Sequence, residues 1–248
     1  MNDQREKSGE KRINISLDGA DAKIIYHIYE RVKVNTLLVS FHEKRRVLST
    51  LDGYKEAYCV ANTYTPPMLA EHMMQNLSEF KRNLPLALGI DPKEIRFLIT
   101  AVDMDNLAVC EQSYEEFKVS CLATAGAKDN AMRTGLDVTR YVERDGNVNA
   151  IGTINLIILT NATLSEAAMA RAIITATEAK TAALQDLDVR STYSPKYQAT
   201  GTGTDNMIVV SGKMGKSLHV SSGHTKMSEL IGFSTKSAVT EALKKHDK

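Results

Sequence analysis

The chain has 248 residues and a mass of 27.3 kDa, which suits one large domain or two small ones. Apolar residues make up 43% and charged residues 25%, proportions that exclude a disordered or collagen-like chain. Lys and Arg total 31 against 30 Asp and Glu, so the chain lacks the excess of positive charge that would indicate nucleic acid as the main partner. No apolar run approaches the roughly 18 residues of a membrane span, so no membrane partner is expected.

The amino-terminal segment MNDQREKSGEKR is polar and lacks the apolar core of a signal peptide. We therefore expect residues 1–12 to be a disordered tail and residues 13–248 to form a single domain. The three cysteines, Cys59, Cys110 and Cys121, form no CxxC pair, which argues against a disulfide framework. Each is interpreted as a small buried hydrophobe, and the compartment implied is the cytoplasm.

The first half of the chain is rich in predicted strands. Between residues 13 and 62 they are the runs INISL, KIIYHIYE, TLLVSF, RVLSTL and EAYCVAN, with turn signals at Asp18-Gly19 and Asp52-Gly53. Pro66-Pro67 ends this region, and apolar residues at helical spacing predict an amphipathic helix over residues 69–80. After Asp91-Pro92, three more strands are predicted: IRFLITAV, LAVCEQ and FKVSCLATA.

The second half contains the longer helices. A polar loop over residues 128–149 precedes AIGTINLIILTN, the most apolar predicted strand. Thr163-Leu-Ser-Glu166 fits a capping box for a helix running to about Leu187. The loop ATGTGTD and the strand NMIVVSG follow, and a last helix is predicted over residues 226–244, with Gly232 as a place where it could kink. Without regular βαβ alternation, these elements favour an α+β fold, with mixed or antiparallel sheets packed against a few long helices.

Four polar, glycine-containing segments are candidates for a functional site: residues 124–133, 152–155, 200–205 and 223–229. Glycine lets a ligand approach the backbone, while Thr and Asn add hydroxyl and amide hydrogen bonds. The segment TGTGTD could form an anion-binding nest, although a plain turn is an equally good interpretation. It has neither the GxGxxG pattern nor the lysine of a phosphate-binding loop. Asp205 could bind a water or ligand, or could bond its own backbone as a turn residue.

Three titratable residues are candidates for acid–base chemistry. Glu178 lies on the long helix, where Ala167, Ala170 and Ile174 lead onto its face, so its carboxylate is expected to be partly desolvated. His224 and Glu229 lie close in sequence and could move a proton together. The alternatives are a Glu bonded to a neighbouring cation and a surface or capping histidine. The six histidines show no HExxH or HxH spacing that would indicate zinc, and no G-x-S-x-G elbow occurs.

Taken in order, several motifs resemble the adenosylcobinamide amidohydrolase (CbiZ) family of corrinoid salvage. They are RVLST with VAN at 60–62, TAG…NAMR at 124–133, GTIN at 152–155, ATEAKTAALQDLDVRS at 176–191, ATGTGTD at 199–205 and GHTKMSELIG at 223–232. The resemblance covers roughly residues 40–245. It departs from the family at Ser228, where the pattern usually carries glycine.

The resemblance implies an enzyme that cleaves a carboxamide C–N bond, releasing 1-aminopropan-2-ol from adenosylcobinamide or a related corrinoid and leaving adenosylcobyric acid. The corrinoid is then the substrate, so no cofactor is required, and the need for a divalent metal stays open, as does a homo-oligomer. Glu178, His224 and Glu229 are the expected catalytic residues. The expected substrate-binding residues are Thr124, Gly126, Asn130, Arg133, Asn155, Lys180, Thr200, Gly201, Thr202, Gly203, Thr204 and Asp205.

Two mechanisms and two other functions stay open from the sequence. Water activated by Glu178 or Glu229 is preferred as nucleophile, with His224 protonating the amine and loop N–H groups holding the oxyanion. A hydroxyl nucleophile, Ser49, Thr124 or Thr204, is the other mechanism. A corrinoid-binding protein without chemistry and a nucleotide-loop binder are the alternative functions.

Overall fold

The most apolar strand of the sequence lies at the centre of the fold. In the computed structural model, which describes residues 9–138 and 153–246, β9 (Ile154–Thr160) is buried along its whole length. Its even-numbered apolar side chains pack into one core and its odd-numbered ones into another. A continuous apolar run of this kind is typical of a strand covered on both faces.

A nine-stranded mixed sheet surrounds this strand, in the order β1-β2-β3-β12-β9-β7-β6, with β4 paired to β3 and β5 paired to β4. The β12–β9 and β4–β5 pairs are parallel, and the other pairs are antiparallel. The remaining strands of this sheet are β1 (Glu10–Ile13), β2 (Ala20–Tyr29), β3 (Val32–Ser49), β4 (Gly53–Tyr64), β5 (Ile95–Thr100), β6 (Ala108–Tyr114), β7 (Phe117–Ala125) and β12 (Asn206–Val210).

Two short pairs of strands lie outside the large sheet. β8 (Ala131–Met132) pairs antiparallel with β11 (Gly201–Thr202), and β10 (Ala162–Leu164) pairs parallel with β13 (Met214–Leu218). A 3₁₀ turn, η1 (Met104–Asn106), connects β5 to β6.

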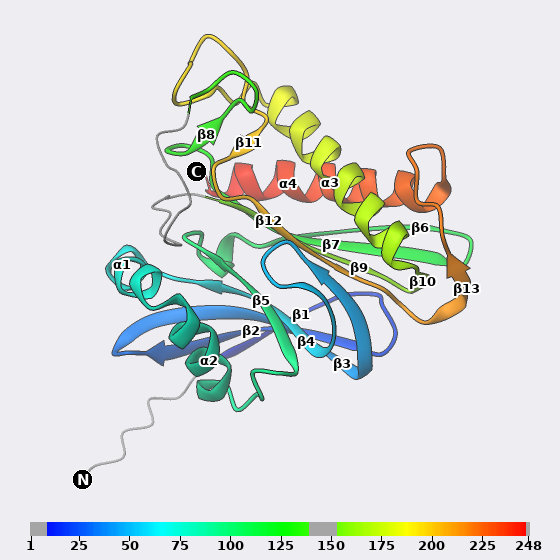
Figure 1. Ribbon diagram of the computed structural model, residues 1–248, viewed down its shortest axis with the longest axis horizontal. Coiled ribbons are helices and arrows are strands. Elements are labelled where there is room, and N and C mark those ends of the chain that lie inside the picture. Colours follow the sequence, from blue (N-terminus) through cyan, green and yellow to red (C-terminus); the bar gives the residue numbers. More distant parts are fainter. Residues whose placement is uncertain (1–8, 139–152, 247–248) are drawn as a thin grey trace.

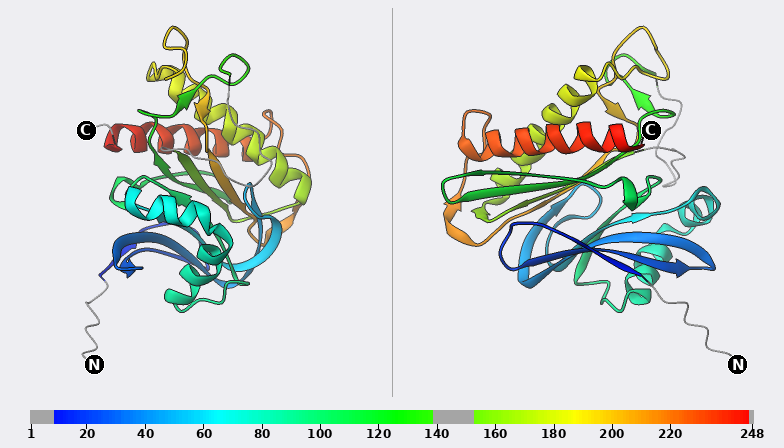
Figure 2. Two further views of the ribbon diagram at one scale, coloured as in Figure 1. Left: turned by 60° about the vertical axis from the view of Figure 1, so that its left-hand side comes forward. Right: turned by 180° about the vertical axis from the view of Figure 1, so that it is seen from behind.

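Helices cover the sheet on two sides (Figures 1 and 2). The long α3 (Glu166–Asp186) and α4 (Lys226–His246) pack over the β6, β7, β9 and β12 part, and α1 (Pro67–Gln75) and α2 (Leu77–Ala87) pack over β2 to β5. A third core lies within the curl of the sheet itself, where side chains of β2, β3, β4 and β5 meet those of β7, β9 and β12. The α+β prediction is therefore confirmed. None of the described helices is long and apolar enough to cross a membrane.

Several predicted elements differ in detail from the structure. The helix predicted over residues 69–80 is two helices, because the chain leaves the helical conformation at Asn76 (φ −130°, ψ 39°). The run TLLVSF and the first four residues of RVLSTL belong to one 18-residue strand, β3. The predicted polar loop contains β8, and its residues 139–149 lie outside the described residues.

The ends of the predicted elements also need correction. Residues 10–12 of the predicted tail are ordered, because Glu10–Ile13 pair with β2 as β1, while residues 1–8 lie outside the described part. Helix α3 is capped by Ser165, whose hydroxyl accepts a hydrogen bond from the Ala168 N–H at 3.2 Å, and not by Thr163. Helix α4 runs through Gly232 as one helix.

Candidate functional site

Three of the singled-out segments meet at one edge of the sheet. The parallel strands β9 and β12 begin side by side, with Asn155 opposite Asn206, and the antiparallel β7 ends there, with Ala125 opposite Ile154. The segments TAG, GTIN and TGTGTD therefore share this edge, and Gly152 of GTIN lies outside the described residues. Helix α3 crosses above the edge and α4 ends beside it (Figure 1).

A buried ion pair between Lys180 and Asp205 lies at the centre of this edge. The side chains are only 7% and 12% exposed. Asp205 also accepts hydrogen bonds from the Ile154 N–H at 3.1 Å, the Thr202 N–H at 3.0 Å and the Thr202 hydroxyl at 2.6 Å. These donors offset the cost of removing the carboxylate from water. The pair joins α3 to the TGTGTD loop and the first residues of β9.

A chain of buried amide and hydroxyl groups continues from the ion pair into the sheet. The Asn155 side-chain N–H donates to the Asn62 side-chain oxygen at 2.9 Å. The Asn62 side-chain N–H donates in turn to the Thr124 hydroxyl at 2.9 Å. Asn155 also donates to the Ile99 carbonyl at 2.9 Å. The Thr153 hydroxyl donates to the Thr204 carbonyl at 2.6 Å, which ties the start of β9 to the TGTGTD loop.

The short β8–β11 pair fixes the loop on the other side. Gly201 and Thr202 lie opposite Met132 and Ala131, and the Thr200 N–H donates to the Met132 carbonyl at 2.8 Å. The Asn130 side-chain N–H donates to the Thr204 hydroxyl at 3.4 Å. The segments TAG…NAMR and TGTGTD are therefore parts of one hydrogen-bonded unit.

Arg133 and Thr200 stabilise this unit from its outer side. The Arg133 guanidinium donates to the Gln198 carbonyl at 2.9 Å, and the Thr200 hydroxyl accepts from the Thr134 N–H at 2.9 Å. Asp137 accepts from the Arg133 N–H and the Ser191 hydroxyl, both at 2.6 Å. Although burial raises the pKa of Asp137, these hydrogen bonds lower it below its ordinary value overall.

Two glycines of the site are required by close packing. A Cβ at Gly201 would lie 2.5 Å from an Asp205 carboxylate oxygen and 2.7 Å from the Lys180 nitrogen. A Cβ at Gly126 would lie 2.9 Å from the side chain of Val102 and 3.2 Å from the ring of His246. The glycines therefore let the TGTGTD loop close on the ion pair and let α4 end against the TAG segment.

The expected catalytic residues do not join this cluster. Helix α4 has 21 residues and is therefore about 30 Å long, and its last residue, His246, is the one that packs beside Gly126. His224 precedes the other end of α4, where Met227 contacts the Thr160 hydroxyl at the end of β9, so the length of β9, roughly 20 Å, separates it from the ion pair at Ile154. Glu229 is also near that end, where it is exposed and paired with Lys226 at 2.9 Å. The structure therefore does not bring His224 and Glu229 together with the loops that surround the ion pair.

Glu178 is near the site in sequence but turned away from it. Its side chain is exposed, as are Ala167, Ala170 and Ile174, the residues from which partial desolvation was expected. The buried face of α3 is formed instead by Ala168, Ala172, Ala176, Lys180 and Ala183. Residues two apart on a helix do not share a face, so Glu178 cannot reach the partners of Lys180. The expected desolvation of Glu178 is a wrong prediction.

Asn62 and Thr153 belong to the cluster but are not among the expected substrate-binding residues, although Thr153 lies in the candidate segment 152–155. Asn62 belongs to the VAN motif, and a single polar residue at the end of a strand's apolar run was the available signal. Ser228, the departure from the family pattern, is buried in α4 with its hydroxyl unpartnered among the described residues.

The cluster is suited to recognising amide and carbonyl groups. Within the described residues, Lys180 has Asp205 as its one hydrogen-bond partner, so its ammonium has further N–H groups to donate to an oxygen. An ammonium in a site of this kind can stabilise a developing oxyanion. Across residues 9–138 and 153–246, no three His, Cys, Asp or Glu side chains gather as metal ligands would.

Comparisons with known proteins agree with the family resemblance of the sequence. The family model described as adenosylcobinamide amidohydrolase (CbiZ) matches residues 21–248. An uncharacterised protein of Methanocaldococcus jannaschii is 44% identical over 227 residues, covering 87% of this chain and 88% of that protein. An adenosylcobinamide amidohydrolase of Methanosarcina mazei is 33% identical over 150 residues, covering 60% and 58% of the two chains.

Among solved structures, a Pyrococcus horikoshii protein covers 93% of this chain and 84% of its own, at 12% identity and a TM-score of 0.43.

Proposed function

The chain belongs to the adenosylcobinamide amidohydrolase (CbiZ) family, and from this premise we propose that it hydrolyses the amide between the corrin ring and the aminopropanol arm of adenosylcobinamide. The products are adenosylcobyric acid and 1-aminopropan-2-ol. The observation that carries the proposal is the convergence of separate family motifs on one buried ion pair, Lys180–Asp205.

The chemistry of the cluster suits this substrate. The corrin periphery carries neutral carboxamides, which pair with amide and hydroxyl groups such as those of Asn130, Thr200 and Thr204. Lys180 would donate to the oxygen of the scissile amide as it becomes an oxyanion. Asp205 would hold Lys180 and the TGTGTD loop in place while the C–N bond breaks. Its role is therefore to position the groups that contact the substrate.

Exposure selects one hydroxyl among the three candidate nucleophiles. Ser49 and Thr124 are 3% and 0% exposed, whereas Thr204 is half-buried at the tip of the TGTGTD loop. A substrate can therefore reach Thr204, while the hydroxyl of Thr124 is engaged by Asn62. If Thr204 attacks, a cobyryl ester forms on its oxygen as the amine leaves with a proton, and water then cleaves the ester. Direct attack by water forms no such ester.

The decisive test is incubation of the purified protein with adenosylcobinamide, followed by mass spectrometry of the products. We expect adenosylcobyric acid and 1-aminopropan-2-ol from the unaltered protein. Lys180→Met is expected to lower the rate by at least about a hundredfold, the scale of a lost oxyanion donor. Lys236→Met is the matched control, because Lys236 forms an exposed ion pair with Asp186.

Binding measurements separate the alternatives. A protein that shifts the corrin absorption spectrum but releases no product would be a corrinoid-binding protein, contrary to the proposal. An ester adduct on the intact protein, lost in Thr204→Ala, would assign the hydroxyl route, and its absence during rapid turnover would assign direct attack by water.

A further inference from the structure

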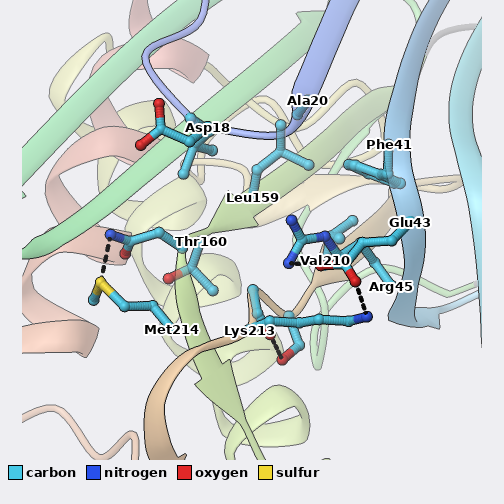
Figure 3. Close-up of a pocket in the computed structure, with 14 residues that line it drawn as sticks. Asp18, Ala20, Phe41, Glu43, Arg45, Leu159, Thr160, Val210, Lys213 and Met214 are labelled. Carbon is cyan, nitrogen blue, oxygen red and sulfur yellow. Dashed lines mark hydrogen bonds and ion pairs between the residues drawn. The ribbon is translucent and has the colours of Figure 1, made fainter.

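A cavity of about 250 Å³ lies at the opposite edge of the sheet from the Lys180–Asp205 pair (Figure 3). It is formed where the parallel strands β9 and β12 end, next to the β2–β3 part of the sheet. The seven residues of β9 separate the two edges by roughly 20 Å. Ligands commonly bind beyond the carboxyl ends of adjacent parallel strands. Nothing in the proposed hydrolysis uses this cavity.

An irregularity in β3 lies beside the cavity. Ser40 pairs with Cys59 and Arg45 with Ala57, so β3 advances five residues while β4 advances two. The inserted residues bend the strand, as β-bulges do. Phe41, Glu43 and Arg45 are alternate residues of β3, so their side chains share one face, and all three line the cavity (Figure 3).

Close backbone packing completes the walls. A Cβ at Gly212 would lie 1.9 Å from the Asn161 carbonyl oxygen, so the segments that follow β9 and β12 touch at this glycine. At Gly19, whose φ is +73°, the chain passes so close that a Cβ would lie 3.2 Å from a terminal nitrogen of Arg45. The floor between these walls is apolar and buried, and consists of Leu17, Phe41, Leu159 and Val210.

The cations of the cavity have too few anionic partners. Lys213 binds one Glu43 oxygen at 2.6 Å, while Arg45 lies 3.7 Å from the other, beyond hydrogen-bond distance. The Lys213 hydrogen bond lowers the pKa of Glu43, so this carboxylate is ionised and serves both cations. In the part of the chain that the structure describes, Arg45 makes no other ion pair or hydrogen bond, although its side chain is only 12% exposed. Its planar donor groups point into the cavity (Figure 3).

We propose that this cavity is a second binding site, for a small monocarboxylate with an apolar body. The Arg45 guanidinium binds the carboxylate through two parallel hydrogen bonds, the geometry that arginine favours for such groups. The apolar body lies on the Leu17, Phe41, Leu159 and Val210 floor. The exposed carboxylate of Asp18 at the rim disfavours ligands of higher negative charge.

The test uses benzoate as probe and isothermal titration calorimetry as readout, with acetate and inorganic phosphate as comparators. We expect millimolar or tighter benzoate binding, weaker acetate binding, and at least about tenfold lower benzoate affinity in Arg45→Met. Glu43→Gln is expected to bind benzoate about threefold tighter, because the competing carboxylate is removed. Glu43 is exposed, so Glu43→Gln is expected to fold, and it still tests the proposed site if Arg45→Met fails to fold. Arg82→Met, an exposed arginine on α2, is the matched control.

Three outcomes would overturn the proposal. One is no benzoate binding at millimolar concentration by either the unaltered protein or Glu43→Gln. Another is benzoate affinity within about twofold in folded Arg45→Met. The third is tighter binding of phosphate than of benzoate, which would assign the cavity to a phosphate and not to a monocarboxylate.

Discussion

Gly201 is the residue at which the candidate site tolerates least change. It lies between the two charged groups, so that a single added carbon would meet both. Gly203, two residues further, is exposed, and a Cβ there would lie 3.0 Å from the side-chain oxygen of Asn130, a longer approach than either contact at Gly201. Gly201 and Gly203 are thus two glycines of the same loop, each between threonines, but they differ in the side chains that surround them.

Gly201→Ala is expected to destabilise the protein by about 2 kcal/mol, because the ion pair must separate to admit the methyl group. Hydrolysis of adenosylcobinamide should fall with it. Gly203→Ala should lower the stability by less than about 1 kcal/mol. Urea denaturation of both variants checks the difference, and equal effects would contradict the packing argument.

At the scale of elements, the start of α3 depends on one hydroxyl. Ser165 caps the helix through its bond with the Ala168 N–H. Ser165→Ala is expected to reduce the free energy of unfolding by about 1 kcal/mol. Thr163→Ala, which removes the residue that the capping-box pattern indicates, should have a smaller effect on the helix. Denaturation curves of the pair check this, and a larger loss in Thr163→Ala would refute the assignment of the cap.

Strands β2, β3 and β4 contain a titratable group that is half-buried. The His27 ring hydrogen-bonds the Thr36 hydroxyl at 3.0 Å, which contacts the Thr63 hydroxyl at 3.1 Å. Burial lowers the pKa of His27 below its ordinary value of 6.5. The unfolded chain therefore binds a proton at a higher pH than the folded chain does. As the pH falls from about 6.5 towards the folded pKa, the unfolded state gains more from protonation, and stability is lost.

We therefore expect a loss of stability between about pH 7.5 and pH 5.5 that is smaller in His27→Gln than in the unaltered protein. The measurement is the free energy of unfolding in urea at both pH values. His42→Gln is the control, because His42 lies exposed on β3. An unchanged pH dependence in His27→Gln would contradict the prediction.

Elements with a strong pattern were predictable, and helix faces rich in alanine were not. The apolar run of β9 and the capping-box pattern before α3 indicate a strand and a helix directly. On α3, however, alanines occupy both the buried and the exposed face, so the sequence does not distinguish Ala168 from Ala167 or Ala170. Glu178 was consequently assigned to the wrong face. Lys180 was among the expected site residues, but its pairing with Asp205 depends on a crossing of α3 over β12 that no local pattern indicates.

At the scale of the whole molecule, His224 and Glu229 lie apart from the other family motifs. The placement of three of the four polar segments follows from strand order, because neighbouring strands place their ends at the same edge. The segment 223–232 leads into α4, and only the direction of that helix shows that His224 lies at the far edge. This direction follows from long-range packing, such as that of His246 beside Gly126.

His224→Ala and Glu229→Gln are therefore expected to retain hydrolysis within about twofold of the unaltered protein, since groups roughly 20 Å from the reacting bond, the length of β9, take no part in proton transfer. Asp205→Asn should lose most of it. Initial rates with adenosylcobinamide check the contrast. A loss of more than about a hundredfold in folded His224→Ala would place the chemistry at the other end of α4.

The position of β12 has a consequence for how the protein forms during synthesis. This strand is made near the end of the chain, at residues 206–210, yet it lies between β3 and β9 and pairs with both. Until it is synthesised, β3 and β9 each present an unpaired edge, and the two parts of the sheet have no strand to join them. Contacts between residues so far apart in the chain make folding slow. A nascent chain that stalls before residue 206 should consequently aggregate through these open edges.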